Sequence, residues 1–406
     1  MIYLGGKEMK SLTTKSVYHD KYMLLCFFVT FFQPLMLWNR EPFNYIFRII
    51  QFVVWVIVAL SSVARWRKWN RYLWLWTFFC FIEIAVILIN SSAERANPVL
   101  AVETVISFLF LVHFLDVFFV EAERRELKFF WNYLFCMIAL ELISFPLYKV
   151  GLISIYWLGI KTRATEPIIA FLLLTLLLRK EIKKERYYIG IALSVIIIIL
   201  LKISTAVIGI AIIAMFIWAA KKPHLKRLLK LLQPSVIIGV SVALTIGILF
   251  FDIQTRFSAL IGLAFSKDIT FSGRYELWKY GISMIQNDDV NHQLWGYGFY
   301  NVSLWVKWQW YTIITESHDQ LLQMVHDTGI IGTILMYLTF HFQLRGLNEC
   351  KNILARNLIA AVCFAMMIMC ITEIYSYHSY FYIIFAIAAR SKNIIENREI
   401  GRRKNV

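Results

Sequence analysis

Two residues in one polar, aromatic segment have side chains suited to chemistry: Arg274 and His318. A guanidinium stays charged, and its planar fork can hold a phosphate or a carboxylate by two parallel hydrogen bonds. An imidazole, with an unperturbed pKa of about 6.5, can take up or release a proton near neutral pH. Considered singly, an arginine in a loop is more often a solvated surface charge, and a histidine before a helix is more often exposed to water. Whether Arg274 and His318 are functional must therefore be judged from the motifs around them.

The same segment gives little support for a metal centre. It contains no Asp-x-Asp pair, and Asp288 and Asp289 lack nearby partner ligands in the sequence. None of the six cysteines lies in a loop that, by the topology derived below, faces the outside of the cell. Disulfides and thiolate metal sites are therefore not expected. We predict a protein without a metal or other cofactor. The six cysteines are Cys26, Cys80, Cys136, Cys350, Cys363 and Cys370.

The elements that position these side chains must be helices in a membrane. Of 406 residues, 59% are hydrophobic and 17% are charged, and the mean hydropathy is +0.63. Soluble domains have roughly half apolar and a quarter charged residues. The apolar runs are continuous instead of alternating, which favours helices over a barrel, and a helix of about 20 residues crosses the hydrocarbon core. We predict an all-α, polytopic membrane helix bundle.

The apolar runs predict about twelve spanning helices. The run over 186–220 is interrupted only at Lys202, Ser204 and Thr205, and one helix of that length would overshoot the bilayer. We therefore divide it into two helices joined by a tight turn. The predicted spans are 21–39, 43–64, 72–90, 98–120, 129–147, 166–179, 186–201, 205–220, 235–252, 319–343, 354–374 and 378–390.

The distribution of lysines and arginines supports this arrangement. Most of the 42 cations fall in loops on one side of the predicted bundle, as in 65–71, 179–186 and 221–230. Cytoplasmic loops carry such an excess, so both termini are predicted to be cytoplasmic. The same belt, attracted to anionic lipid head groups, accounts for the net charge of +16. No nucleic-acid-binding motif is present, and we predict no nucleic-acid partner.

One connection is far longer than the others. Residues 253–318 form an outward segment of about 65 residues, and loops of that length are usually functional or disordered. Its many aromatic residues argue for order. We expect short helices on the outer membrane face, with the tryptophans at head-group depth. The predicted organisation is a nine-helix bundle over 1–252, the extracytoplasmic segment 253–318, and three helices with a basic tail over 319–406.

Ionisable groups inside the spans are costly and need partners. Glu83 lies deepest and is expected to have a partner within the bundle. Arg48 is close enough to a helix end to reach the interface. His326 lies within the helix that follows the long segment and is expected to be packed instead of catalytic.

Four short motifs follow one another between residues 272 and 332. The chain reads Ser-Gly-Arg-Tyr-Glu-Leu-Trp over 272–278, Leu-Trp-Gly-Tyr-Gly-Phe over 294–299, Glu-Ser-His-Asp-Gln-Leu-Leu over 316–322 and Gly-Ile-Ile-Gly over 329–332. In this order the motifs resemble the O-antigen ligase and Wzy-type polysaccharide polymerase superfamily. The family transfers or polymerises glycans carried on undecaprenyl diphosphate at the outer face of the cytoplasmic membrane.

The resemblance implies roles for particular residues. His318 matches the family's loop histidine and Arg274 one of its outward arginines. Arg163, in Gly-Ile-Lys-Thr-Arg-Ala-Thr-Glu-Pro over 159–167, resembles a second arginine. At the place of a third arginine this chain has Lys202, which offers a point charge without the bidentate fork.

Two aromatic residues inside the motifs, Trp278 and Tyr297, are further candidates for substrate binding. The cluster of Trp305, Trp308, Trp310 and Tyr311 could stack on sugar rings, but an interfacial anchor is the commoner use of such residues.

The implied reaction is a glycosyl transfer from a lipid diphosphate. Outward guanidiniums would stabilise the leaving diphosphate, and His318 would either take the proton from the acceptor hydroxyl or position that hydroxyl. The outward cations would replace a divalent ion, and direct attack would invert the anomeric centre. We favour a polymerase of undecaprenyl-diphosphate-linked repeat units in the bilayer, with a chain-length regulator as a possible partner. The alternatives are a ligase that uses another acceptor and a flippase for the same lipid-linked glycan. Transport is disfavoured because no internal repeat is evident.

Overall fold

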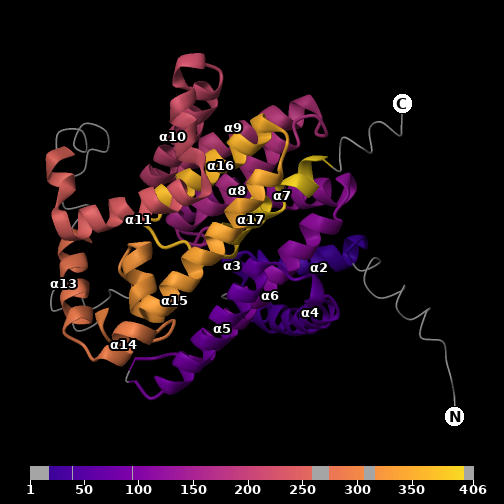
Figure 1. The fold of residues 1–406 in the computed structure, drawn as a ribbon. Helices are drawn as coiled ribbons and strands as arrows, with labels where there is room; N and C mark the ends of the chain where they lie inside the picture. The colour runs from indigo at the N-terminus through magenta and orange to yellow at the C-terminus, as the bar shows by residue number, and fades with distance from the viewer. Residues whose placement is uncertain (1–17, 39, 94, 258–273, 306–315, 397–406) are drawn as a thin grey trace, which may run out of the picture.

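The computed structural model describes residues 18–38, 40–93, 95–257, 274–305 and 316–396. Within these ranges the chain is all-α, and the only extended pairing consists of two isolated β-bridges. Figure 1 shows the helices gathered in one bundle, with the short helices α13 and α14 beside α15. The predicted fold class is confirmed.

Each of the twelve predicted segments contains a helix. The bundle helices are α2 (Lys21–Phe31), α4 (Phe43–Ala64), α5 (Arg71–Ile89), α6 (Pro98–Glu121), α7 (Arg124–Lys149), α8 (Thr165–Leu177), α9 (Lys184–Leu201), α10 (Ser204–Ala220), α11 (Pro234–Phe251), α15 (Gln320–Arg345), α16 (Ile353–Met369) and α17 (Ser379–Ala389). Among the described residues, six helices are long and apolar enough to cross a membrane, namely α4, α5, α6, α7, α11 and α15. The chain is thus a multi-pass membrane protein, and the count of twelve spans stays a prediction.

The first predicted span, 21–39, is not one helix. Helix α2 ends at Phe31, and the chain resumes in the short helix α3 (Leu35–Trp38). Pro34 separates them, because proline has no N–H to donate and disfavours helical backbone in the residue before it. Further along, α9 and α10 are two helices as predicted. Lys202 lies between them in the left-handed region, with φ of 52°.

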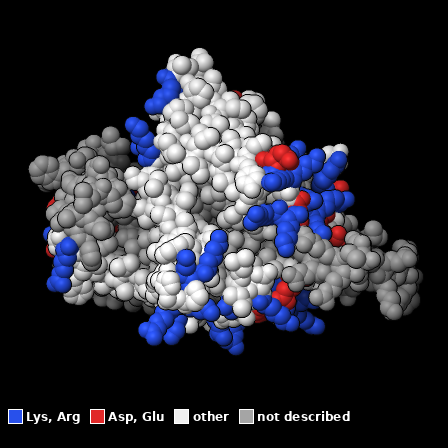
Figure 2. All heavy atoms as spheres, turned by 90° about the horizontal axis from the view of Figure 1, so that it is seen from above, with Lys and Arg blue, Asp and Glu red and all other residues white. Residues whose placement is uncertain are grey.

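Short 3₁₀ helices join several of the long ones. They are η1 (Trp66–Lys68), η2 (Lys161–Ala164), η3 (Pro223–Leu232), η4 (Ile253–Phe257) and η6 (Gly346–Glu349). Figure 2 shows a broad uncharged surface with lysines and arginines at its margins, which fits a protein whose middle faces lipid.

The described part of the long segment folds onto the bundle. Helix α13 (Arg274–Gln286) and helix α14 (Val290–Trp295) pack against α15. Trp278 and Trp305 are fully buried there, so their rings contact protein instead of lipid, and the expected head-group depth of the aromatic residues stays a prediction. Trp308, Trp310 and Tyr311 lie outside the described residues.

Two glycines determine how α14 meets α15. Helix α15 kinks at Gly329, where φ is 62°, and Gly296 after α14 has φ of 83°. A Cβ on Gly329 would lie 2.3 Å from the carbonyl oxygen of Leu294, and one on Gly296 would lie 2.3 Å from that of Asp327. The two backbones touch only because both residues lack a side chain. This contact explains why two of the glycine-containing motifs occur together.

Three ionisable residues inside the predicted spans have partners in the structure, of which only Glu83 was expected to need one. Glu83 accepts a hydrogen bond from the backbone N–H of Phe299 at 2.9 Å, so its partner is the Gly-x-Gly turn. Arg48 lies 3.7 Å from Glu103. His326 is fully buried, with Nδ1 2.7 Å from Asp327. All six cysteines are free.

Candidate functional site

Arg274 begins α13 and reaches the connection between α16 and α17. One terminal nitrogen donates to the carbonyl oxygen of Thr372, and the other donates to Oε1 of Glu373 at 3.1 Å. The guanidinium is about one-fifth exposed, at 21%. One charged side chain therefore joins the long segment to residues 370–378, which we call the α16–α17 loop.

His318 projects from a tightly held turn directly before α15. The turn needs a left-handed residue, and His318 has φ of 57°. On one side the indole N–H of Trp278 donates to the carbonyl of Ser317 at 2.8 Å. On the other, the carboxylate of Asp319 caps α15 by accepting from the N–H of Leu322 at 2.7 Å. Because both neighbours are held, the backbone of the turn that carries His318 is held as well.

The imidazole of His318 is 35% exposed and lies between opposite charges. Its Nδ1 is 3.4 Å from Oε1 of Glu316. Partial burial and the positive charge of Arg274 lower the pKa of His318, and the carboxylate of Glu316 opposes them. Burial also raises the pKa of Glu373, whereas the positive charge of Arg274 and its hydrogen bond lower that pKa. At neutral pH, His318 is therefore mostly unprotonated, which is the form that can accept a proton.

Arg163 lies in η2, at the start of α8, and faces a cavity of about 180 Å³. The lining of the cavity also includes Tyr300, Tyr377 and His378. Burial raises the pKa of Tyr300; the charge of Arg163 opposes this rise, and the charge of Glu316 adds to it. The structure thus places Arg163 in a cavity that it shares with His378, at the end of the α16–α17 loop.

His378 ends the same loop that receives Arg274. Its Nδ1 contacts the carboxylate of Glu166, which is completely buried at the start of α8. The α16–α17 loop is held further by Gln320, whose side-chain oxygen accepts from the backbone N–H groups of Tyr375 and Ser376 at 2.9 and 3.0 Å. The loop therefore connects Arg274, the first turn of α15 and the Arg163 cavity.

Lys202 stands apart from these residues. It is exposed at the turn between α9 and α10, and within the described part of the chain its ammonium makes no hydrogen bond or ion pair. The structure gives it no contact with Arg274 or His318.

The two aromatic candidates occupy inner positions. Trp278 is fully buried, so it can act on a substrate only through the carbonyl of Ser317 that it holds. The ring of Tyr297 is stacked between the rings of His292 and His326, at centroid distances of 4.3 and 4.9 Å. Trp278 holds the turn of His318, and Tyr297 packs against the apolar cluster that contains Trp278.

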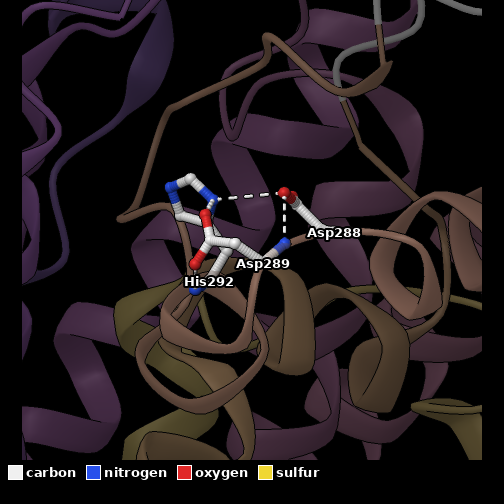
Figure 3. A group of neighbouring side chains, drawn as sticks. All are labelled: Asp288, Asp289 and His292. Carbon is white, nitrogen blue, oxygen red and sulfur yellow. Dashed lines mark hydrogen bonds and ion pairs between the residues drawn. The ribbon is translucent and has the colours of Figure 1, made fainter.

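Asp288 and Asp289 have a partner that the sequence analysis missed. Figure 3 shows His292 directed at them, with Nδ1 3.4 Å from Asp288 and 2.8 Å from Asp289. The expectation that these aspartates lack nearby ligands is wrong, since the start of α14 brings the histidine back by one turn. Asp289 caps α14, accepting from the N–H groups of Asn291 and His292 at 2.6 and 3.1 Å. Capping accounts for the cluster without an ion.

Sequence reasoning also missed the carboxylates that surround the two leading residues. Glu373 and Glu316 contact Arg274 and His318, and Glu166 holds His378. One signal was available: Glu166 belongs to the motif that contains Arg163, and a buried carboxylate calls for a basic partner. Nothing in the local sequence connects Glu373 to Arg274.

The comparisons with known proteins agree with the geometry. A family model described as O-antigen ligase (Wzy_C) matches residues 189–337, a region that contains Lys202, Arg274 and His318. No curated protein matches the chain. The match supports an O-antigen ligase or polymerase type of function, with a glycosyltransferase-like enzyme and a lipid-linked glycan substrate. It confirms the resemblance drawn from the motifs: residues 189–337 of this multi-pass membrane protein are similar to the O-antigen ligase and Wzy-type superfamily.

Proposed function

We propose that the protein polymerises undecaprenyl-diphosphate-linked oligosaccharide repeat units into a surface polysaccharide, at the outer face of the cytoplasmic membrane. The observation that carries the proposal is that α13, which begins at Arg274, is joined to the turn of His318 by the hydrogen bond from Trp278 to the carbonyl of Ser317 at 2.8 Å. Burial and the charge of Arg274 both lower the pKa of the imidazole. A permanent positive charge beside a neutral base suits a reaction that expels an anion and takes up a proton.

In the proposed step, a hydroxyl of one repeat unit attacks the anomeric carbon of another. The bond from that carbon to the diphosphate oxygen breaks, and the diphosphate leaves with the electron pair. Arg274 stabilises the charge on the leaving group, and His318 takes the proton of the hydroxyl. Attack from the face opposite the leaving group inverts the anomeric configuration. The cation takes the role that a divalent ion has in other glycosyl transfers, so the transfer is metal-independent.

The other candidate residues have supporting roles in this proposal. Arg163 and the cavity beside it hold the sugar or phosphate nearest the reacting centre. Trp278 and Tyr297 keep the turn of His318 in place, and Lys202 contributes charge at the membrane surface. The segment 253–318 and the α16–α17 loop form the reacting region, while the helices of 1–252 form its membrane scaffold. Both termini lie in the cytoplasm, where a chain-length regulator could also act.

A ligase is the second candidate, because the matching family model is described as O-antigen ligase. Such an enzyme would use the same residues and pass the finished glycan to a different acceptor.

The test is turnover of the purified protein with undecaprenyl-diphosphate-linked repeat units, in EDTA, beside His318→Ala. A ladder of longer lipid-linked glycans that is absent from the variant supports the polymerase. Transfer that occurs only when a second acceptor, such as a lipid A core, is added indicates the ligase. Activity lost in EDTA and restored by a divalent ion would contradict metal independence and direct attention to Asp288, Asp289 and His292.

A further inference from the structure

At the end of α15 opposite His318, a cavity of about 640 Å³ is lined by cations from three elements. Lys226 and Lys230 come from η3, Arg345 ends α15, and Arg356 belongs to the first turn of α16. His341, one turn before Arg345, adds a fifth nitrogen base. The volume falls within the range of about 300 to 1,000 Å³ that is usual for small-ligand sites.

Within the part of the chain that the structure describes, no carboxylate neutralises this group of cations. Among the described residues that line the cavity none is acidic, and Glu349, at the end of η6, lies outside the lining. Within the described ranges, none of the four cations forms an ion pair with a carboxylate. Like charges gathered around one hollow repel each other, and an anion bound between them removes that repulsion.

The start of α11 adds to the positive potential. Gln233, Pro234 and Ser235 also line the cavity, and α11 begins at Pro234 without a side-chain cap. The partial positive charge at the start of a helix attracts negative charge. The cavity therefore suits an anion with several acceptor oxygens.

The surroundings of the cavity indicate that this anion belongs to a lipid. In η3, Leu225, Leu228, Leu229 and Leu231 are partly buried, while Lys226 and Lys230 are exposed. Short helices with one leucine-rich face and one basic face lie in the head-group plane of a membrane. Basic pockets between helices at the cytoplasmic side bind the head groups of anionic lipids.

A second cavity provides a place for acyl chains. It measures about 420 Å³ and is lined by apolar residues that include Leu176, Phe216 and Leu358. Its polar lining includes Arg179, Lys180, Lys221 and the carboxylate of Glu181, and Asn357 lines both cavities. A phosphodiester in the first cavity would thus have apolar surface within reach on the other side of Asn357.

We propose that the cavity between η3, the end of α15 and the start of α16 is a binding site for the phosphodiester head group of an anionic glycerophospholipid. The site is separate from Arg274 and His318 and does not depend on the proposed glycan transfer. The guanidiniums of Arg345 and Arg356 hold the phosphate oxygens, and the two lysines of η3 neutralise the remaining charge.

The test is native mass spectrometry of the delipidated full-length protein with added phosphatidylglycerol or phosphatidylcholine of identical acyl chains. We expect at least about tenfold higher occupancy by phosphatidylglycerol, because only this lipid has a net negative charge. The triple substitution Lys226→Gln, Lys230→Gln and Arg356→Gln should remove the preference.

A matched control removes three exposed cations that do not line the cavity: Arg67→Gln, Lys68→Gln and Lys184→Gln. This variant should keep the preference, although its net charge changes equally. The proposal would be overturned if the two lipids occupied the wild type equally. It would also be overturned if the cavity variant kept the full preference for phosphatidylglycerol, or if the control variant lost as much of that preference as the cavity variant. Thermal unfolding provides the check on folding. In phosphatidylcholine the cavity variant should have the same melting temperature as the wild type, and it should lose only the increase in melting temperature that phosphatidylglycerol gives the wild type.

Discussion

Arg274 donates a hydrogen bond to Glu373 at 3.1 Å, across 99 residues of sequence. The same guanidinium donates to the carbonyl of Thr372, so both contacts use its fork. Arg274 is consequently held in place by the α16–α17 loop before any substrate arrives. A donor group that is already oriented needs little reorganisation when charge develops on the leaving diphosphate.

Arg274→Lys should therefore be severely impaired, although the charge is kept. A lysine cannot make both contacts, and the loss of one oriented donor typically costs about 100- to 1,000-fold in rate. Initial rates of glycan transfer on purified protein measure the effect. Lys279→Arg, an exposed cation one turn further along α13, is the control and should behave as wild type. Near-normal transfer by Arg274→Lys would show that guanidinium geometry is irrelevant.

His318→Asn should abolish transfer while leaving the fold intact. Asparagine tolerates the left-handed backbone that His318 adopts, which alanine tolerates less well. General bases contribute about 100- to 10,000-fold to rates, so a loss of that size is expected in transfer. Equal melting temperatures of variant and wild type would exclude misfolding. If His318→Asn retained substantial activity, the imidazole would be only a positioning group.

The pH dependence of transfer should report on Glu316. Burial and Arg274 lower the pKa of His318, and Glu316 raises it. The rate should fall as His318 becomes protonated, which places the acidic limb of the profile below about pH 6.5. Glu316→Gln removes the one opposing charge, so the pKa of His318 should fall further and the limb should move to lower pH. An unchanged limb, or one moved to higher pH, would show that another group controls it.

The sequence predicted the helices well because their signals are local. The break between α9 and α10 followed from the length of the apolar run, and Glu83 was expected to need a partner because burial of a charge is costly. The identity of that partner, the N–H of Phe299, was beyond reach because it depends on how the long segment folds back.

The candidate site was only half predictable for the same reason. Arg274 and His318 stand in recognisable motifs, but Glu373 and His378 are brought to them by the packing of α16 and α17. The contact of His292 with Asp288 was missed for a different reason, because these residues are only four apart in the sequence. The contact depends on a six-residue helix, which is too short to give a periodic signal. Contacts between distant segments require tertiary structure, whereas apolar periodicity does not.

Asp319 gives a prediction about stability. Its carboxyl caps α15, and burial raises its pKa to about 7. Because this pKa lies above the unfolded value of about 3.9, the stability it contributes is present at low pH and is lost as pH rises through about 7. Asp319→Asn keeps a capping side chain that is always neutral, so its melting temperature should equal or exceed that of the wild type at pH 8. The difference should shrink at pH 5. Asp319→Ala removes the carboxyl altogether, so its cost should be larger at pH 5, where the carboxyl is mostly neutral, than at pH 8; the loss of a cap typically costs about 1 kcal/mol.

The orientation of the chain in the membrane is open to a direct labelling experiment. The cation distribution assigns α14 to the outside and η3 to the cytoplasm. Asn291 on α14 and Lys226 on η3 are both exposed, so a cysteine at either position should react with a maleimide. In a Cys136→Ser background, which removes the one exposed native thiol among the described residues, an impermeant maleimide should label Asn291→Cys in intact cells. It should label Lys226→Cys only after lysis. The reverse pattern would place His318 in the cytoplasm, where a polymerase of exported repeat units could not reach its substrate.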